Sequence, residues 1–411
     1  MRLLERLDDA LASIAKSGLT RQRRAVSTAC GPHQHIGDQA VLSFNSNDYL
    51  GLAQDPQIKA ALMEGVAMYG VGSGASHLIS GHSVAHEQLE TRCAELYASH
   101  IPQAQALSFS TGYMANLAVL TALSTGLDET EIFSDALNHA SIIDAARLSR
   151  AKVSVYPHLD LATLQVQLAA SRADHKLVVT DGVFSMDGDM APLPALLALC
   201  ETFDATLVVD DAHAFGVLGA HGLGTLQHFN VCSPRLVLMA TLGKAAGVSG
   251  AFVVAHHQIT QWLIQRARPY IYTTAAPPAL ACAAVQSLDI ITGSQGQLLR
   301  QKLTDLLSFW KQEAQTFIEV NDDPHDSPCL LPSSTPIQPV MLGSNEAVMQ
   351  TSQQLLDAGI WVTGIRAPTV AQGTARLRIT LSAAHTHHDL MRLVDAMKRL
   401  VTPRQDVRVL A

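Results

Sequence analysis

The stretch LVLMATLGKAAGVSGAFVVA, residues 236–255, combines apolar and small side chains with a single charge, Lys244, near its middle. Glycines at 243, 247 and 250 predict that it breaks into two short strands joined by a turn, which argues against a membrane span. About nine residues separate the strand ending near Thr241 from the strand beginning at 250, too few for a crossover helix. We therefore expect these two strands to pair antiparallel.

Lys244 is the most informative residue of this stretch. An amine held in apolar surroundings has a lowered pKa, because its ammonium form loses solvation, and the neutral amine can then attack a carbonyl. The alternative is a lysine whose head group reaches solvent from a loop, which a lone lysine would favour. The residues upstream favour Schiff-base chemistry instead.

The composition is that of a well-buried globular chain with one large domain and one or two smaller ones. Charged residues make up 16% of the 411 residues, and the mean hydropathy is +0.16. A net charge of −8 argues against a nucleic-acid surface. The cysteines are scattered, with neither a CxxC pair nor a secretory leader, and the amphipathic start, residues 1–19, carries acidic residues unlike a transit peptide. We expect a cytoplasmic protein with reduced thiols and no membrane partner.

Short apolar runs alternate with helical patterns between about residues 55 and 285, which predicts a mostly parallel α/β sheet buried on both faces. The clearest runs are 105–109, 176–182, 206–212 and 235–241. The antiparallel pair makes this sheet mixed. After the Pro-Pro pair at 277–278, a long helical region leads into a smaller α+β domain, whose polar segment 321–336 is expected at the surface.

We expect three parts along the chain: an N-terminal helix and arm at 1–50, a large α/β domain at 51–285 and an α+β domain at 286–411. The glycine-rich segment 70–83 matches neither a dinucleotide nor a P-loop fingerprint, and we interpret it as a mobile loop near the site. The HTHH run at 385–388 is interpreted as the solvated start of a helix rather than a metal site.

Polar residues stand at the predicted carboxyl ends of the strands, where open α/β sheets bind ligands. Asp210 closes one strand and Lys244 follows a later one. This pair fits a pyridoxal phosphate site, in which the lysine forms an imine and the carboxylate keeps the pyridine nitrogen protonated. A metal pair or a strand-end cap at 210–213 is the alternative; without a third well-placed ligand, we expect no metal.

Two further features fit such a site. The turn Ser110–Tyr113 opens a predicted helix, and a helix amino terminus with a glycine suits a phosphate, although such turns often carry Ser or Thr for capping alone. His139 lies just before another predicted helix and could stack on an aromatic ring, although a lone histidine is more often structural.

Eight segments, taken in order, resemble the α-oxoamine synthases, a family of fold-type-I pyridoxal phosphate enzymes. They are FNSNDYLGL, SGHSVAHEQLE, FSTGYMAN, HASIIDAARLS, TDGVFSMDGDMAPL, VVDDAHAFGVLG, TLGKAAGVSGAFV and GTARLRITLSAAH. The resemblance covers nearly the whole chain. It implies an aminotransferase-like α/β fold with a mixed, mostly parallel seven-stranded sheet, and a homodimer in which Thr273 and Thr274 reach the phosphate site of the neighbouring subunit.

The resemblance also implies a role for each site residue. Lys244 would carry the pyridoxal phosphate, Asp210 would pair with its pyridine nitrogen and His139 would stack on its ring, which makes these three the catalytic residues. The other residues expected to contact the cofactor are Gly112, Tyr113, Ser185, His213 and Thr241. The substrate would be contacted by His139, by Asn47 and Arg378 at its carboxylate, and by Arg21 and Thr369 at the acyl part.

The segments IYTTAAPPA and IWVTGIRAPTVAQGTARLRITLSAAH resemble the branch of the family that acts in biotin synthesis. That branch implies an acyltransferase that condenses L-alanine, with decarboxylation, with a pimeloyl thioester on CoA or acyl carrier protein. A sister enzyme using glycine and acetyl-CoA, or a non-catalytic family member, is the alternative. The family motif GSGGSR reads GSGASH here, with Ala75 and His77, which leaves the acyl-chain preference open.

Overall fold

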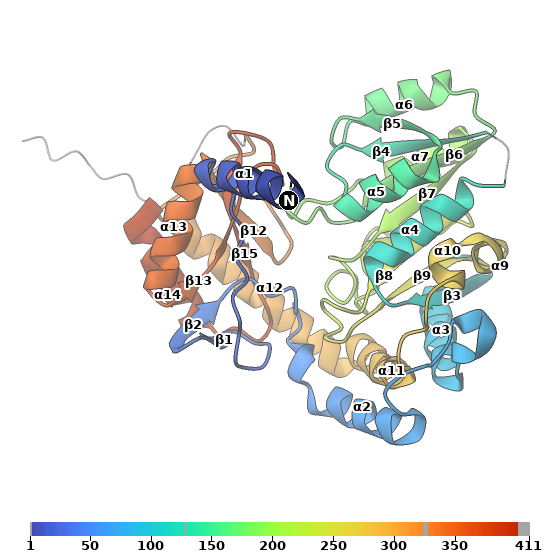
Figure 1. The fold of residues 1–411 in the computed structure, drawn as a ribbon, viewed down its shortest axis with the longest axis horizontal. Coiled ribbons are helices and arrows are strands. Elements are labelled where there is room, and N and C mark those ends of the chain that lie inside the picture. Colours follow the sequence, from blue (N-terminus) through green and yellow to red (C-terminus); the bar gives the residue numbers. More distant parts are fainter. Residues whose placement is uncertain (1, 127–128, 324–327, 402–411) are drawn as a thin grey trace, which may run out of the picture.

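The computed structural model describes residues 2–126, 129–323 and 328–401, and its largest element is a seven-stranded sheet (Figure 1). The strand order is β3-β9-β8-β7-β6-β4-β5, and β9 alone runs against the other six. The strands are β3 Ala104–Phe109, β4 Thr130–Asp135, β5 Lys152–Tyr156, β6 His175–Asp181, β7 Ala205–Asp210, β8 Leu236–Thr241 and β9 Ala251–His256. The mixed sheet and the antiparallel pairing of β8 with β9 are both confirmed.

The turn between β8 and β9 depends on glycine at position 247. Its φ is +67°, and a Cβ there would lie 2.4 Å from the backbone nitrogen of Ala53. Both the positive φ and the close approach exclude a larger side chain. The apolar run therefore breaks here, and Lys244 lies in the turn between the two strands.

The sheet is covered by helices on both faces. Leu207 and Val209 pack into one core cluster and the intervening Val208 into a second one, as alternation along a strand requires. The first cluster includes residues of α3 Val84–Tyr97, α6 Leu161–Ala170, α7 Leu193–Thr202 and α11 Pro278–Thr292. The second includes residues of α4 Gly112–Leu123, α5 Ala140–Ser149, α9 His257–Arg266 and α10 Arg268–Ile271. With both faces apolar, polar side chains concentrate at the strand ends.

The smaller part of the molecule joins the two ends of the chain. A five-stranded sheet has the order β10-β11-β12-β15-β14, and a three-stranded sheet pairs β2 in parallel with β13. These strands are β1 His33–Ile36, β2 Gln39–Ser43, β10 Glu319–Val320, β11 Cys329–Leu330, β12 Ile337–Gly343, β13 Ile360–Trp361, β14 Thr363–Ile365 and β15 Ala375–Thr380. The N-terminal arm thus belongs to the same sheet as a strand of the C-terminal part, and the three domain boundaries stay a prediction.

The remaining helices connect and cover these sheets. They are α1 Arg2–Lys16, α2 Pro56–Tyr69, α8 Thr225–His228, α12 Ser294–Ala314, α13 Asn345–Asp357 and α14 His387–Val401, with short turns η1 Leu52–Gln54 and η2 His77–Gly81. In Figure 1, α2 packs along α11, and α12 runs between the large sheet and the smaller part. None of the helices in the described ranges has the length and apolar character needed to cross a bilayer.

Two expectations from the sequence are wrong. The segment 321–336 is not a simple surface excursion, because Cys329 and Leu330 form a buried strand and the hydroxyls of Ser333 and Thr335 donate to Gly188 O. Residues 324–327 of that segment lie outside the described residues. Local polarity misleads here because the polar groups find partners inside the fold.

The run 385–388 is only partly a solvated helix start. His387 and His388 are exposed, but His385 is buried, stacks on Phe44 with 4.5 Å between ring centroids, and lies 3.0 Å from Ser43 O through Nε2. His385 is therefore a core histidine with hydrogen-bond partners. Its contact with Ser43 O connects the end of β2 to the C-terminal part.

Candidate active site

A cavity of about 180 Å³, here called the Lys244 pocket, lies where β6, β7 and β8 end and α4 and α5 begin. It is lined by Gly112, Tyr113, His139, Ser141, Asp181, Ser185, Asp210, Ala212, His213, Met239, Thr241 and Lys244. All eight residues expected to contact the cofactor are in this set. The fold therefore collects, at one edge of the sheet, residues that lie more than 130 positions apart in the chain.

Lys244 is half-buried at the centre of this pocket. Its Nζ lies 2.7 Å from His213 Nε2. Burial lowers the pKa of Lys244 to about 8, although the carboxylates of Asp210 and Asp181 act in the opposite direction. A substantial fraction of this amine is therefore neutral near pH 8 and available as a nucleophile or base.

His213 links Lys244 to a buried tyrosine. Its Nδ1 lies 2.6 Å from the hydroxyl of Tyr49. Tyr49 is not among the site residues predicted from the sequence. Burial, reinforced by the positive charge of Lys244, keeps the pKa of His213 well below its ordinary value, so its ring is neutral. The row Tyr49, His213 and Lys244 forms a hydrogen-bonded chain that fixes where the amine points.

Asp210 and Asp181 are neighbouring carboxyl groups with different environments. Asp210 Oδ2 accepts a hydrogen bond from Asn116 Nδ2 at 2.7 Å, and Oδ1 accepts one from the Ala212 N–H at 3.0 Å. Burial, followed by the negative charge of Asp210, raises the pKa of Asp181 well above its usual range. The raised pKa of Asp181 favours its neutral, protonated form.

The amino end of α4 forms one side of the pocket. Thr111 caps this helix, its Oγ1 accepting from the Met114 N–H at 3.2 Å, and the first backbone N–H groups of a helix have no partner within the helix itself. Thr241 faces it, its hydroxyl donating to Gly250 O at 3.0 Å. Free N–H groups and the helix dipole together favour a phosphate here.

His139 forms the opposite wall. It is the N-cap of α5, and its Nδ1 lies 2.7 Å from Ser141 Oγ, while its backbone N–H donates to Asp181 Oδ2 at 3.1 Å. The ring is exposed to the pocket and held at both its side chain and its backbone. Such an imidazole can stack on a planar aromatic ligand.

Arg376 and Arg378 point to the same side of β15, so the alternation of the strand cannot tell their roles apart. Their partners in the structure differ. The Arg376 guanidinium is ion-paired with Asp187, so its charge is already compensated. Arg378 instead donates from Nε to Ser185 O at 2.6 Å and from both terminal nitrogens to Asn47 Oδ1 at 3.2 Å. Because Ser185 lines the Lys244 pocket, Arg378 and Asn47 stand at its edge with a charge that a carboxylate could compensate.

The remaining expected residues lie elsewhere in the chain. Arg21 and Thr369 are exposed, Thr369 in a turn closed by its N–H to Arg366 O, and neither is among the residues lining the pocket. Thr273 is half-buried and Thr274 exposed between α10 and α11. The glycine-rich segment 70–83 contains η2 and packs on the ring of Tyr270; it too contributes no residue to the pocket lining.

Sequence reasoning missed the residues that hold the site rather than face the ligand. Asp181 follows the same apolar run as Ser185, and its position at a strand end was a usable signal. Tyr49 and Asn116 offered none, because their partners lie 164 and 94 residues away.

The fold and the pocket define a pyridoxal phosphate-dependent enzyme of the family described as aminotransferase class I and II, whose model matches residues 39–397. In structure, the chain resembles serine palmitoyltransferase from S. paucimobilis with a bound PLP–myriocin aldimine, with a TM-score of 0.85 and 26% identity over 97% of this chain and 98% of that one. It also resembles 8-amino-7-oxononanoate synthase from Francisella tularensis, with a TM-score of 0.72 and 31% identity over 87% and 97%.

Sequence comparison shows to which group within this family the chain belongs. The 8-amino-7-oxononanoate synthase of Janthinobacterium sp. (strain Marseille) is 55% identical over 400 residues, 97% of this chain and 98% of the relative. That of Cupriavidus necator is 52% identical over 408 residues, 98% and 99% of the two chains. The chain therefore belongs to the 8-amino-7-oxononanoate synthases, and the predicted family, enzyme class and cofactor are confirmed.

Proposed function

We propose that this chain condenses L-alanine with a pimeloyl thioester, on CoA or acyl carrier protein, to give 8-amino-7-oxononanoate, CO2 and the free thiol. The observation that carries the proposal is the gathering of Lys244, Asp210 and His139 in one pocket with Arg378 at its edge. The names of the relatives support the same reaction.

The residues of the pocket fit pyridoxal phosphate. Lys244 would bind it covalently, the fixed carboxylate of Asp210 would face its pyridine nitrogen and His139 would stack on its ring. The amino end of α4, with Gly112 and Tyr113, and Thr241 would hold its phosphate, while Ser185 and His213 would contact its phenolic side. When bound, the cofactor supplies an electron sink that stabilises negative charge on the substrate α-carbon.

The residues of the chain then divide the work of the reaction. Arg378 and Asn47 hold the alanine carboxylate, since a guanidinium can grip two oxygens in one plane. The Lys244 amine, with a pKa near 8, can take the α-proton and later return one to the same carbon. A carbon–carbon bond forms to the thioester carbonyl as the thiol leaves. The carboxylate then departs as CO2, leaving its electron pair on carbon for protonation.

The proposal also covers the acyl contacts and the assembly of the protein. Arg21 and Thr369 are proposed to contact the acyl substrate, and both are accessible to a large thioester. We also propose a cytoplasmic homodimer in which Thr273 and Thr274 reach the neighbour's phosphate site. Exposed apolar side chains near that segment, Leu148 at 61% and Tyr272 at 70%, form a surface that a partner subunit could cover. The thiols of Cys30 and Cys232 suit a reducing compartment.

The test is a single panel in which CO2 release is measured with alanine, glycine and serine against several acyl thioesters. We expect the highest kcat/KM with alanine and a pimeloyl thioester. A preference for glycine with acetyl-CoA would instead support a sister enzyme, and no release with any pair would support a non-catalytic role. Light scattering of the cofactor-loaded protein measures its molar mass in solution and so tests the proposed dimer. An active monomer would contradict that proposal.

A further inference from the structure

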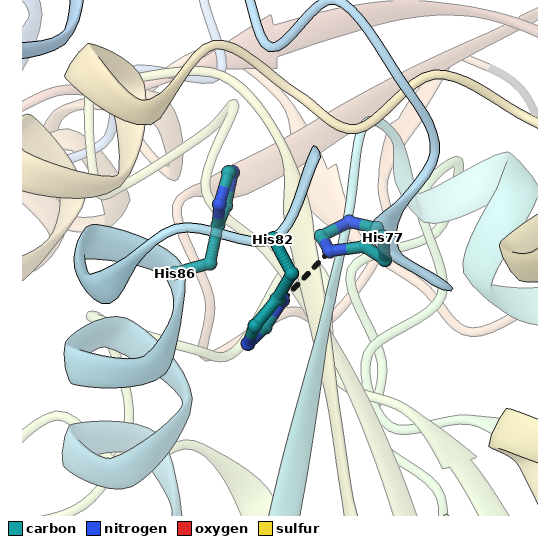
Figure 2. A group of neighbouring side chains, drawn as sticks. All are labelled: His77, His82 and His86. Carbon is teal, nitrogen blue, oxygen red and sulfur yellow. Dashed lines mark hydrogen bonds between the residues drawn. The ribbon is translucent and has the colours of Figure 1, made fainter. Parts of the chain in front are cut away.

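Three histidines outside the Lys244 pocket are close neighbours (Figure 2). One ring nitrogen each of His77, His82 and His86 lies within 4.8 Å of the others, and the ring centroids are 5.0 to 5.6 Å apart. We propose that these three side chains form a binding site for one first-row divalent transition-metal ion, with Zn²⁺ the ion that fits best. Imidazole nitrogen is a preferred ligand of Zn²⁺, and three such ligands leave a fourth position open.

The spacing of the nearest nitrogens fits shared coordination. His77 Nδ1 lies 2.9 Å from His82 Nδ1 in a direct hydrogen bond, drawn as the dashed line in Figure 2. Two imidazole nitrogens on one tetrahedral Zn²⁺ lie about 3.3 Å apart, given Zn–N bonds of about 2.0–2.1 Å. A movement of a few tenths of an ångström would give this pair that spacing, and the ligand nitrogen of His86, which lies within 4.8 Å of both, would approach as the ion binds.

The outer nitrogens of His82 and His86 already have the kind of partner that metal-bound histidines use. His82 Nε2 lies 3.1 Å from a carboxylate oxygen of Glu87, and His86 Nε2 lies 2.9 Å from Ala276 O. Such acceptors hold the proton on the outer nitrogen and turn the lone pair of Nδ1 toward the ion. His86 Nδ1 now accepts from the Ser83 N–H at 3.1 Å, and a metal ion would take that lone pair instead.

Acidic side chains lie beside the three histidines. Glu87 and Glu90 line the adjoining cavity of about 370 Å³, together with His77 and His82. This cavity has room for a water as fourth ligand.

A metal ion here would join three segments. His77 belongs to η2 and His86 to the first turn of α3. The third segment is the one before α11, where Ala276 O is the hydrogen-bond partner of His86 Nε2 and accepts a second hydrogen bond from the Ser73 hydroxyl. The ion would therefore fix the glycine-rich segment 70–83 to the large sheet's helices without touching the Lys244 pocket. The sequence alone predicts no metal, and it does not single out positions 77, 82 and 86 as a group; their approach depends on the fold of η2.

The experiment titrates the cofactor-loaded, metal-free protein with ZnCl2 by calorimetry and with CoCl2 by visible spectroscopy. We expect one Zn²⁺ per chain, a Co²⁺ spectrum of a low-coordinate nitrogen site, and a melting temperature raised by zinc. His82→Ala should weaken binding at least about 100-fold, and Glu87→Gln, which removes an outer partner, about tenfold. His82 is chosen over His86 because His86 also forms the capping box of α3.

Matched controls separate this site from other zinc ligands. The exposed His387 and His388, changed together to Ala, and the exposed Cys30 and Cys232, changed together to Ser, should leave the Zn²⁺ affinity unchanged. If His82→Ala does not fold, as judged by circular dichroism, His77→Asn replaces it. Absence of zinc binding by the wild-type chain, equal binding by the folded histidine variant, or loss of binding in either control would overturn the proposal.

Discussion

The Lys244 pocket and the residues proposed for acyl recognition differ in how firmly the single chain holds them. In the pocket, Lys244, Asp210 and Arg378 each contact side chains from other elements at 2.7 to 3.2 Å. Arg21 and Thr369 are exposed and make no contribution to the pocket lining in the described part of the chain. One chain thus preorganises the Lys244 pocket, whereas the proposed acyl contacts of Arg21 and Thr369 would form only with the bound substrate or with a partner subunit.

This contrast predicts the largest effect for the lysine. Lys244→Ala should lower turnover at least about 10⁴-fold, because the variant loses both the covalent link to the cofactor and the amine that moves the α-proton. The visible absorbance of the bound cofactor should change with it. The exposed Lys59, changed to Ala, is the matched control and should retain both. Normal turnover in Lys244→Ala would show that the pocket is not the active site.

The two buried carboxyl groups should respond unequally. Asp210→Asn should lower kcat at least about 30-fold, since losing a charge-assisted hydrogen bond costs about 2 kcal/mol. Asp181→Asn should cost less than about threefold in kcat, because the raised pKa of Asp181 already favours its neutral form. Steady-state kinetics of both variants with saturating cofactor would check the order, and the reverse order would exchange the two roles.

The two arginines of β15, at the edge of the pocket, should also differ in the effect of their substitution. Arg378→Ala should raise the Kd for alanine by at least about tenfold, because a charge-assisted pair is worth about 1.5–3 kcal/mol. Arg376→Ala should change that Kd little but lower the melting temperature, because it leaves Asp187 without its ion pair. Alanine titrations followed by cofactor absorbance would measure both. A weakened titration in Arg376→Ala alone would transfer the clamp to that residue.

What could be predicted from the sequence was local. The strands around Lys244 and the antiparallel pair follow from apolar runs and glycines that lie close together in the chain. Strand β5 was not foreseen, since its pattern is that of a largely exposed edge strand. Burial of His385 and of the segment from Cys329 to Thr335 depends on partners far away, which periodicity cannot report.

The site shows the same limit in physical terms. Asp210 and Lys244 could be singled out because a strand end concentrates polar groups at the ligand side of such a sheet. The pairing of Arg378 with Asn47 spans 331 residues, so its assignment came from the family resemblance and not from spacing. Arg376 and Arg378 lie on one face of the same strand, and only their tertiary contacts distinguish them. Arg376 pairs with the carboxylate of Asp187, whereas Arg378 donates to uncharged oxygens of Ser185 and Asn47.

The lowered pKa of Lys244 predicts a pH dependence of cofactor loading. With a pKa near 8, the neutral amine makes up about one tenth of the lysine at pH 7 and about half at pH 8. The rate of pyridoxal phosphate uptake by the cofactor-free protein should therefore rise about fivefold between these values and level off above pH 9. A lysine with its ordinary pKa would instead show a rise that continues toward pH 10.

The smallest effects are expected at the exposed acyl residues, and they test the comparison most directly. Arg21→Ala and Thr369→Ala should raise the KM for the pimeloyl thioester by no more than about fivefold, because exposed charge and hydroxyl contacts are worth roughly 0–1 kcal/mol. The Kd for alanine should not change, since neither side chain reaches Arg378. The neighbouring exposed Arg24, changed to Ala, is the matched control. An effect of Arg21→Ala as large as that of Arg378→Ala would mean that the assembled enzyme buries Arg21 against its substrate, and acyl recognition would then be as preorganised as the chemistry.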